Sequence, residues 1–287
     1  MPDFSEFAVD GVLRDGGSIR VRAIRPDDKQ RLVDHFHSLS PRSVHFRFFG
    51  AKRRLSEAEL QRFTELDFVR NVALVATLRG DDGERFVGVG RYMSTAEGRA
   101  EVAFAVSDEH QGRGIGSMLL EHLAEIARAN GITEFEADVL GENNQMLAVF
   151  RRSGFTVKRS LEAGVVHVSF PTEETPASVQ VSLDRQMRAS AESVRHFLEA
   201  RSSAGVGASE RADSLGGAVL RNLLSGGYRG ELHPVHPRLE RIFGLTAHAS
   251  IAAIGSAPEL AIVAVPRANV AEVVAECARA GVRAVLV

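Results

Sequence analysis

The sequence contains one cysteine, Cys277, among its 287 residues, so no disulfide can form within the chain. The lack of disulfides fits a reducing compartment, and we expect a cytoplasmic protein. Cys277 lies within an apolar helical pattern over residues 270–280, which predicts a packed side chain rather than a nucleophile.

Long apolar runs and an excess of charge of one sign are also missing. No stretch approaches the roughly 20 apolar residues that span a bilayer, and the acidic N-terminus MPDFSEFAVDG lacks a signal-peptide core. The formal net charge is −2, so we expect neither nucleic acid nor a membrane as a partner. His35, His37 and His45 have no acidic clusters near them in the sequence, so we expect no metal site.

Hydrophobic periodicity divides the N-terminal part of the chain, up to residue 170, into short strands and helices. Strands are predicted at 18–24, 72–78, 86–93, 100–106, 135–140, 157–160 and 165–170. Helices are predicted at 26–38, at 40–49, after a capping box at Ser56–Glu59, between the loop after Val106 and Gly131, and at 145–153. This mixture predicts an α/β fold.

In residues 101–116 a strand runs into a glycine-rich turn, and the turn opens a helix. Amide N–H groups at a helix N-terminus lack intrahelical partners, and the helix dipole favours anions there. Gly112, Gly114 and Gly116 let an oxygen-rich ligand approach the backbone, which predicts a pyrophosphate-binding loop. Taken alone, such a loop can also be a simple tight turn. It is not a Walker loop, because no Gly-Lys-Ser/Thr follows, and a dinucleotide site is disfavoured because the preceding unit is not βαβ.

Two motifs around this loop carry a resemblance to a known family. Gln111-x-x-Gly114-x-Gly116 resembles the Q/R-x-x-G-x-G/A motif of the GNAT N-acetyltransferases, and Gly141-Glu142-Asn143-Asn144 with Ser153-Gly154-Phe155 resembles their second motif. The predicted order of elements is also similar to that fold. The resemblance implies a mixed, mostly antiparallel sheet flanked by helices, with acetyl-CoA as the cosubstrate.

The resemblance also implies which residues hold acetyl-CoA. The backbone at the end of the strand would pair with pantetheine, the amides of the turn would hold the pyrophosphate with further donors from Gln111 and Arg113, and Asn143 would lie beside the thioester. The predicted cofactor-binding residues are Phe104, Ala105, Val106, Gln111, Gly112, Arg113, Gly114, Ile115, Gly116, Ser117 and Asn143.

Acetyl transfer to a lysine needs a base, because the amine has a pKa of ~10.4 and freeing it at neutral pH costs about 4–5 kcal/mol. Glu101 opens the strand before the loop and shares a strand face with the small Ala103 and Ala105, which leave room for a ligand. We predict Glu101 as the catalytic base, a role that many GNAT relatives give to a glutamate on this strand, with Glu97 and Asp138 as substitutes. The alternative is an ordinary acid at a strand edge.

Three further positions bear on the chemistry. Many GNAT enzymes carry a tyrosine general acid four residues before the glycine of Gly-Phe, and here that residue is Phe150, which excludes a tyrosine acid at this position. His110 just precedes the loop and is a candidate base, but we expect it to be a surface residue. The amide of Val106 is expected to polarise the thioester carbonyl.

Residues 171–177 are polar and contain proline, so we place a boundary there, followed by a connector helix at 183–200. From residue 201 strand and helix patterns alternate, which predicts a parallel, Rossmann-like sheet. The segments that resemble the CoA-binding domain of ADP-forming acyl-CoA synthetases are Gly207-Ala208-Ser209, Gly227-Tyr228-Arg229-Gly230 and Val235-His236-Pro237. This makes Gly207, Ala208 and Ser209 candidates for nucleotide or CoA binding. The strand before Gly207 lacks the usual valines and His236 replaces an asparagine, so a docking or sensing domain is the alternative.

The sequence stops at Val287 inside an apolar strand, where so short a parallel sheet would expose an edge, so we expect a truncated chain. The expected organisation is a GNAT domain at 1–174, a connector at 175–200 and an incomplete CoA-binding domain at 201–287.

This domain pair resembles the bacterial protein lysine acetyltransferases of the Pat type. The segments that resemble that group's GNAT module are Arg25-Pro26, Leu39-Ser40-Pro41-Arg42-Ser43 and Phe46-Arg47-Phe48-Phe49. The resemblance implies acetylation of a lysine on an AMP-forming acyl-CoA synthetase. A GNAT enzyme for a small amine and a non-catalytic CoA sensor are the alternatives, and the presence of Glu101 argues against the sensor. A true acyl-CoA ligase is excluded because the sequence lacks the phosphorylatable-histidine domain of that family.

Overall fold

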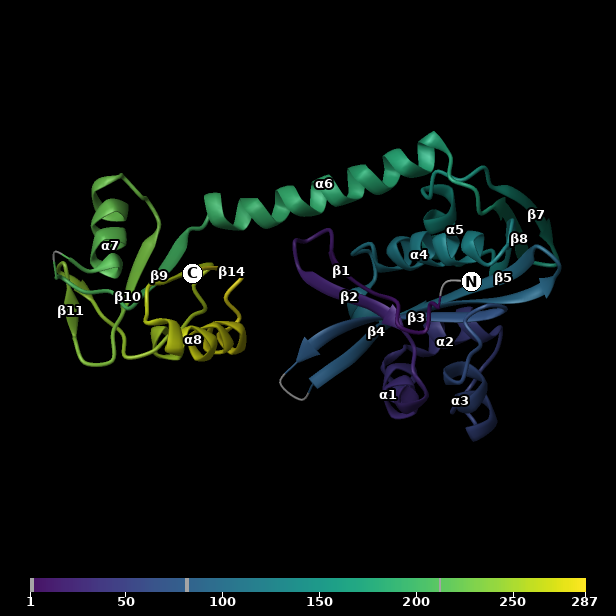
Figure 1. The fold of residues 1–287 in the computed structure, drawn as a ribbon, viewed down its shortest axis with the longest axis horizontal. Helices are drawn as coiled ribbons and strands as arrows, with labels where there is room; N and C mark the ends of the chain where they lie inside the picture. Colours follow the sequence, from purple (N-terminus) through teal and green to yellow (C-terminus); the bar gives the residue numbers. More distant parts are fainter. Residues whose placement is uncertain (1–2, 81–82, 212) are drawn as a thin grey trace. The chain divides into compact units, whose positions relative to one another are not determined.

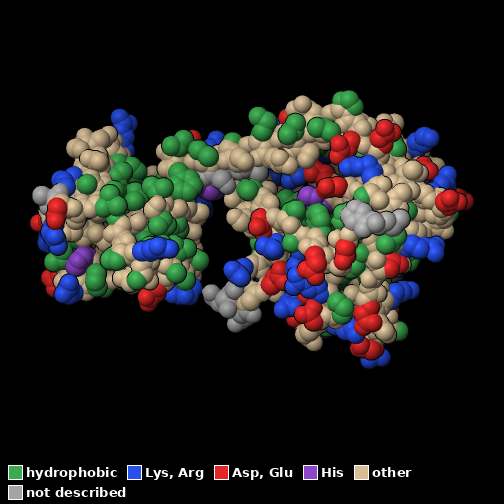
Figure 2. All heavy atoms as spheres, viewed as in Figure 1, with side chains coloured by type: hydrophobic (Ala, Val, Ile, Leu, Met, Phe, Trp, Pro, Cys, Tyr) green, Lys and Arg blue, Asp and Glu red, His purple; other side chains and the backbone are tan. Residues whose placement is uncertain are grey.

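A computed structural model describes residues 3–80, 83–211 and 213–287. The chain divides into two compact units, Met1–Ser190 and Ala191–Val287. Acidic and basic side chains are interspersed over the visible face of the first unit, as the small net charge suggests (Figure 2).

The first unit is built on an eight-stranded sheet in the order β1-β2-β3-β4-β5-β6-β8-β7 (Figure 1). Every neighbouring pair is antiparallel except β5 and β6, which are parallel. The strands are β1 Ala8–Val12, β2 Ser18–Ala23, β3 Asn71–Gly80, β4 Gly83–Ala96, β5 Arg99–Val106, β6 Glu134–Leu140, β7 Lys158–Glu162 and β8 Val165–Pro171. This mixed, mostly antiparallel sheet confirms the predicted fold class.

Helices cover both faces of this sheet (Figure 1). One face carries α1 Lys29–Ser38, α2 Pro41–Phe48 and α3 Glu57–Thr64, and the other carries α4 Ile115–Ala129 and α5 Asn144–Arg151; the short 3-10 turns are η1 Pro26–Asp28 and η2 Asp108–His110. The side chains of Leu119, Leu123 and Ile126 on α4 are fully buried, as their spacing predicted. Burying each one stabilises the unit by about 1.5–3 kcal/mol, which fixes α4 against the sheet.

Two elements differ from the sequence prediction. Strand β1 was not predicted, because Asp10 and Gly11 interrupt its alternation, and it pairs with β2 across a hairpin. Helix α6, Pro176–Leu198, begins at Pro176 rather than near Leu183. Its start is fixed by reciprocal hydrogen bonds between Thr175 and Ser178, a serine variant of the capping box.

His35 lies on the buried side of α1, where its side chain is almost fully enclosed. Its Nδ1 lies 3.1 Å from the Ser107 hydroxyl, which lies 3.1 Å from the Ser38 hydroxyl. Burial lowers the pKa of His35 to about 4, so the imidazole is neutral at physiological pH.

This buried histidine predicts acid sensitivity of the first unit. The unfolded chain takes up a proton at His35 below pH ~6.5 and the folded chain does not, so stability falls as the pH drops from about 6.5 towards 4. Between about pH 7 and pH 5 the loss from this group is about 2 kcal/mol. Replacing His35 with glutamine should remove that part of the slope, whereas His37→Gln, on the exposed side of α1, should keep it.

The measurement is urea unfolding at both pH values, followed by pulsed hydrogen exchange and mass spectrometry on peptides from β3, which report the first unit alone. Identical pH slopes for the parent and for His35→Gln would show that the folded protein accepts this proton.

The second unit is a four-stranded parallel sheet in the order β10-β9-β13-β14, which confirms the predicted parallel fold. Its strands are β9 Ser202–Val206, β10 Glu231–Val235, β13 Leu260–Val263 and β14 Ala284–Leu286, its helices are α7 Leu215–Ser225 and α8 Arg267–Ala280, and its smaller elements are β11 Arg241–Ile242, β12 Leu245–Thr246 and η3 Ala252–Ile254. Cys277 is fully buried on α8, as predicted. Among the described residues, no helix is long and apolar enough to cross a membrane.

Candidate active site

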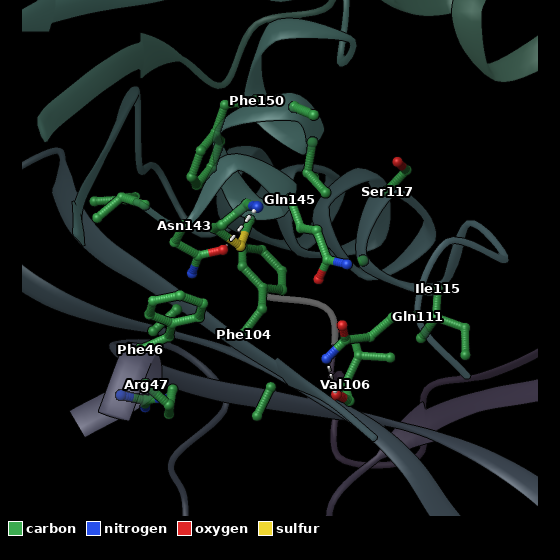
Figure 3. A pocket seen from close by; sticks show the side chains of 18 of the residues that line it. Phe46, Arg47, Phe104, Val106, Gln111, Ile115, Ser117, Asn143, Gln145 and Phe150 are labelled. Atoms are coloured by element: carbon green, nitrogen blue, oxygen red, sulfur yellow. Dashed lines mark hydrogen bonds between the residues drawn. The ribbon is translucent and has the colours of Figure 1, made fainter. Parts of the chain in front are cut away.

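A cleft of about 280 Å³ opens in the first unit beside β5 and β6, the start of α4 and the helices α2 and α5. Figure 3 shows Phe46 and Arg47 at one end, Ile115, Gln111 and Ser117 at the other, and Phe104 and Asn143 between them. Glu101 and all the predicted cofactor-binding residues except Arg113 line it.

The start of α4 forms a cradle of main-chain donors at one end of this cleft. The N-cap residue, Gly114, has a φ of +98°, and among the described residues no side chain caps the first turn. The first N–H groups of the helix therefore point outward without intrahelical acceptors. A Cβ on Gly112 would meet nothing within 4 Å, so the turn leaves open space for an anion. These features fit a diphosphate.

Glycine on the neighbouring strand sets the position of this cradle. A Cβ on Gly88 of β4 would lie 2.8 Å from Ile115 Cγ2, so only glycine lets the first residue of α4 pack this closely on the sheet. The hairpin between β1 and β2 holds the loop from the other side, because Arg14 N–H donates to the Arg113 carbonyl at 3.1 Å. The loop is thus held in place by the fold before any ligand binds.

The side chain of Arg113 does not line the cleft. Its Nε donates to the Asp15 carboxylate at 2.7 Å, and this ion pair ties the loop to the β1–β2 hairpin. Gln111 also bonds to protein groups, because its side-chain amide donates to the Val106 carbonyl at 3.1 Å and to the Ser43 hydroxyl at 3.3 Å. Both residues that were predicted as side-chain donors therefore fix the loop, and the main chain is left as the donor surface.

Strand β5 offers an open backbone edge beside the cradle. It pairs with β6 only over Arg99–Glu101, although β5 itself continues to Val106. The N–H of Ser107 donates to the Val87 carbonyl of β4, so by alternation the N–H groups of Phe104 and Val106 point the other way, into the gap beside β6. This edge fits an extended amide-containing chain such as pantetheine.

Asn143 lies across this gap as the N-cap of α5. Its side-chain oxygen accepts from the Met146 N–H at 3.1 Å (Figure 3). Within the described part of the chain its amide nitrogen donates to no residue, and it remains available to a ligand in the cleft.

Of the three predicted carboxylates, Glu101 and Asp138 line the cleft and Glu97 does not, since it sits in the turn after β4. Glu101 is exposed on the face of β5 that also carries Ala103. Asp138 is engaged by His167, whose Nδ1 lies 2.6 Å from its carboxylate. Among the described residues nothing forms such a hydrogen bond with Glu101, so its carboxylate is better placed to take a proton from a ligand.

His110 was wrongly predicted to be a surface residue. It is buried, and its Nδ1 has no hydrogen-bond partner among the described residues. The 3-10 turn η2, which precedes the loop, turns the His110 side chain towards the interior. The polarity of the side chain alone did not indicate this orientation. Burial lowers the pKa of His110, which keeps the imidazole in its neutral form.

Phe150 is also buried. Its ring packs edge-on against Phe104, with centroids 6.3 Å apart, and lies tilted against Phe170 at 5.4 Å. It forms part of the cleft wall and supplies no ionisable group at that position.

Sequence reasoning assigned no role in the cleft to several arginines. Arg14, Arg47 and Arg152 line it, and Arg91 lies beside Arg47 in an adjoining cavity. These residues come from four separate elements or turns, so no local motif brings them together. The pattern that links Arg91 to the site is the strand register, which sets it opposite Ala103 of β5.

The predicted residues of the second unit lie in the loop after β9. Gly207 has a φ of +82°, and a Cβ there would lie 2.4 Å from the Ala264 carbonyl. A Cβ on Gly216 of α7 would lie 2.2 Å from the Gly207 carbonyl, so both glycines permit close packing of loop and helix. Ala208 is fully buried, and Ser209 accepts a hydrogen bond from the Arg211 N–H.

Each of the two units matches a known protein family. Residues 43–155 match the Acetyltransferase (GNAT) family, and residues 201–287 match a CoA binding domain. The chain is 32% identical over 148 residues to an acetyltransferase of Pseudomonas aeruginosa, an alignment that covers 51% of this chain and 80% of that protein.

Two further similarities concern proteins called Pat. The chain is 31% identical over 169 residues to Acetyltransferase Pat of Mycolicibacterium smegmatis, covering 57% of this chain and 49% of Pat, so it matches about half the length of that relative. The crystal structure of the GNAT domain of S. lividans PAT matches with a TM-score of 0.53 and 46% identity, covering 57% of this chain and 96% of that domain.

Proposed function

The chain belongs to the GNAT acetyltransferase family, and from this premise we propose that it acetylates a lysine Nε-amine on another protein, an AMP-forming acyl-CoA synthetase. The observation that carries the proposal is the shared cleft, in which Glu101 and the uncapped start of α4 face the same space. One end suits the diphosphate of acetyl-CoA, and the other holds a carboxylate for the amine.

In this reaction the amides of the α4 turn hold the pyrophosphate, and the open edge of β5 aligns pantetheine. Glu101 takes the proton of the attacking amine, directly or through a water. The N–H of Val106 points into the gap and stabilises the oxyanion that forms on the thioester carbonyl. Phe150 donates no proton, so the CoA thiolate, with a thiol pKa near ~8.5, leaves without a tyrosine acid at that position.

Exposed apolar side chains beside Glu101 support a protein acceptor over a small amine. Phe49 lines the cleft and is 45% exposed, and Met93, which pairs with Glu101 across β4 and β5, is 40% exposed. Large exposed side chains of this kind at a cleft mouth suit contact with a protein surface. The similarity to the two Pat proteins points in the same direction.

The test is incubation of the full chain with labelled acetyl-CoA and a purified AMP-forming acyl-CoA synthetase, followed by mass-spectrometric mapping of acetylated lysines. We expect label on one synthetase lysine and loss of adenylation activity, because acetylation removes the charge of that lysine. Parallel reactions use a panel of small amines and the Glu101→Gln chain. Label on small amines but not on the synthetase would contradict the proposed acceptor.

A further inference from the structure

Two arginines lie near Glu101, at the end of the cleft where the acceptor amine is proposed to bind. Arg47 comes from the last turn of α2 and lines the cleft itself. Arg91 comes from β4 and sits directly opposite Ala103, on the same sheet face as Glu101 and diagonal to it. Both arginines also line an adjoining cavity of about 50 Å³, and Ala103 and Ala105 of β5 are part of its lining.

The charge of Glu101 acts on both arginines, but among the described residues no carboxylate forms an ion pair with either of them. Within the described residues, Arg47 and Arg91 form no ion pair or hydrogen bond, and their guanidinium groups stack on Phe48 at 5.1 Å and on Phe63 at 4.4 Å. Arg99, on the same strand as Glu101, differs in this respect, because it pairs with Glu134 at 3.3 Å and Glu136 at 3.0 Å. The guanidinium donors of Arg47 and Arg91 are thus left for a group from outside.

The charges at this end of the cleft do not balance. Burial, together with the positive charges of Arg47 and Arg62, lowers the pKa of Arg91 to about 10, although the charge of Glu101 acts in the opposite direction. Burial likewise lowers the pKa of Arg47, and Glu101 offsets this only in part. An incoming lysine adds another cation to this cluster, so binding improves if the acceptor also brings a negative charge.

We propose that Arg47 and Arg91 bind a carboxylate of the acceptor, an aspartate or glutamate side chain close in sequence to the lysine that reaches Glu101. A guanidinium presents donors in a planar fork that matches a carboxylate, and the aromatic rings beneath keep both forks in place. The pair therefore selects which lysines are acetylated. This inference rests on the proposed acetylation of protein lysines.

The experiment measures how fast the full chain, supplied with acetyl-CoA, acetylates peptides that are made in matched pairs, called twins. Each peptide carries one lysine and one glutamate placed up to about four residues away, a span that covers the reach of an extended chain across the cleft. Its twin carries glutamine instead. At one favoured spacing we expect the glutamate peptide to be about tenfold better in kcat/KM, mainly through KM, because a charged hydrogen-bonding pair is gained.

Variants assign the effect to the arginines. Arg91→Gln and Arg47→Gln should bring the glutamate-to-glutamine ratio close to one, while Arg91→Lys should restore part of it. Arg99→Gln is the matched control, since it removes one positive charge near Glu101 from an arginine that already has acidic partners, and it should leave the ratio unchanged. Far-ultraviolet circular dichroism identifies any variant that fails to fold. Even without the variants, the parent chain and the peptide twins show whether a glutamate near the lysine improves acetylation.

The possible results distinguish failure of the carboxylate site from failure of the proposed protein-lysine acetylation. Equal acetylation of every glutamate and glutamine twin would overturn the carboxylate site and leave lysine acetylation standing. If neither the peptides nor the synthetase is acetylated, while aminocaproate is acetylated faster than its amide, the acceptor is a small acidic amine and the protein-lysine proposal falls. A glutamate preference that survives both arginine-to-glutamine variants would also overturn the assignment to Arg47 and Arg91.

Discussion

Replacing Glu101 with glutamine is expected to lower the rate of acetyl transfer by about 100- to 10,000-fold, the range in which a positioned base contributes. Glutamine keeps the shape of the side chain and loses only the ability to accept the proton. The binding of acetyl-CoA should stay unchanged, because Glu101 lies near the start of β5 and the α4 turn follows the end of that strand. The residual rate should rise steeply with pH, as more of the amine becomes free without help.

The control for this prediction is Asp138→Asn, which alters the other carboxylate of the cleft. Asp138 already bonds to His167, so its loss should change the rate by far less than the loss of Glu101. The measurement is the single-turnover rate of acetyl transfer to the mapped lysine, taken for the Glu101→Gln and Asp138→Asn variants at equal occupancy by acetyl-CoA. If the asparagine variant is the slow one and the glutamine variant keeps the parent rate, Asp138 is the base.

The local features of the fold and the site were predictable from the sequence. The α4 pattern, the glycines of the turn and the alternation in β5 each depend on residues a few positions apart, and all lie where the sequence indicated. The start of α6 and strand β1 were missed because their signals, a serine in place of glutamate in a capping box and a strand broken by Asp10 and Gly11, are weak.

What the sequence did not indicate depends on contacts between distant segments. Arg113 was predicted to face the ligand, but the β1–β2 hairpin brings Asp15 to it from 98 positions away. Arg47 and Arg91 meet only because α2 crosses the sheet face on which β4 and β5 are in register. No spacing rule within one segment carries that information.

The second unit complicates any test of cofactor binding, because it matches a CoA binding domain of its own. Total binding to the full chain therefore does not report the α4 turn alone. Local protection does: hydrogen exchange in peptides covering the loop and the first turn of α4 should slow on addition of acetyl-CoA.

Replacing Gly114 with aspartate is expected to weaken acetyl-CoA binding at the α4 turn by about 100-fold, ~3 kcal/mol. A side chain at φ +98° strains the turn, and the introduced carboxylate both repels a diphosphate and competes for the same main-chain donors. The fold itself has room, since the nearest neighbour of a Cβ there, Arg14 Cγ, is 3.5 Å away.

Gly131→Asp, at the other end of α4, is the matched control. Gly131 has a φ of +79° and nothing within 4 Å of a Cβ, so it shares the backbone strain and the added charge but lies far from the turn. The Gly131→Asp chain should be less stable, but acetyl-CoA should still protect its loop from hydrogen exchange. Protection of the loop in Gly114→Ala should lie between that of Gly114→Asp and that of Gly131→Asp, because alanine adds strain without charge. If Gly114→Asp keeps the parent protection at the parent acetyl-CoA concentration, the diphosphate does not bind at this turn, and the orientation of the thioester towards Glu101 loses its basis.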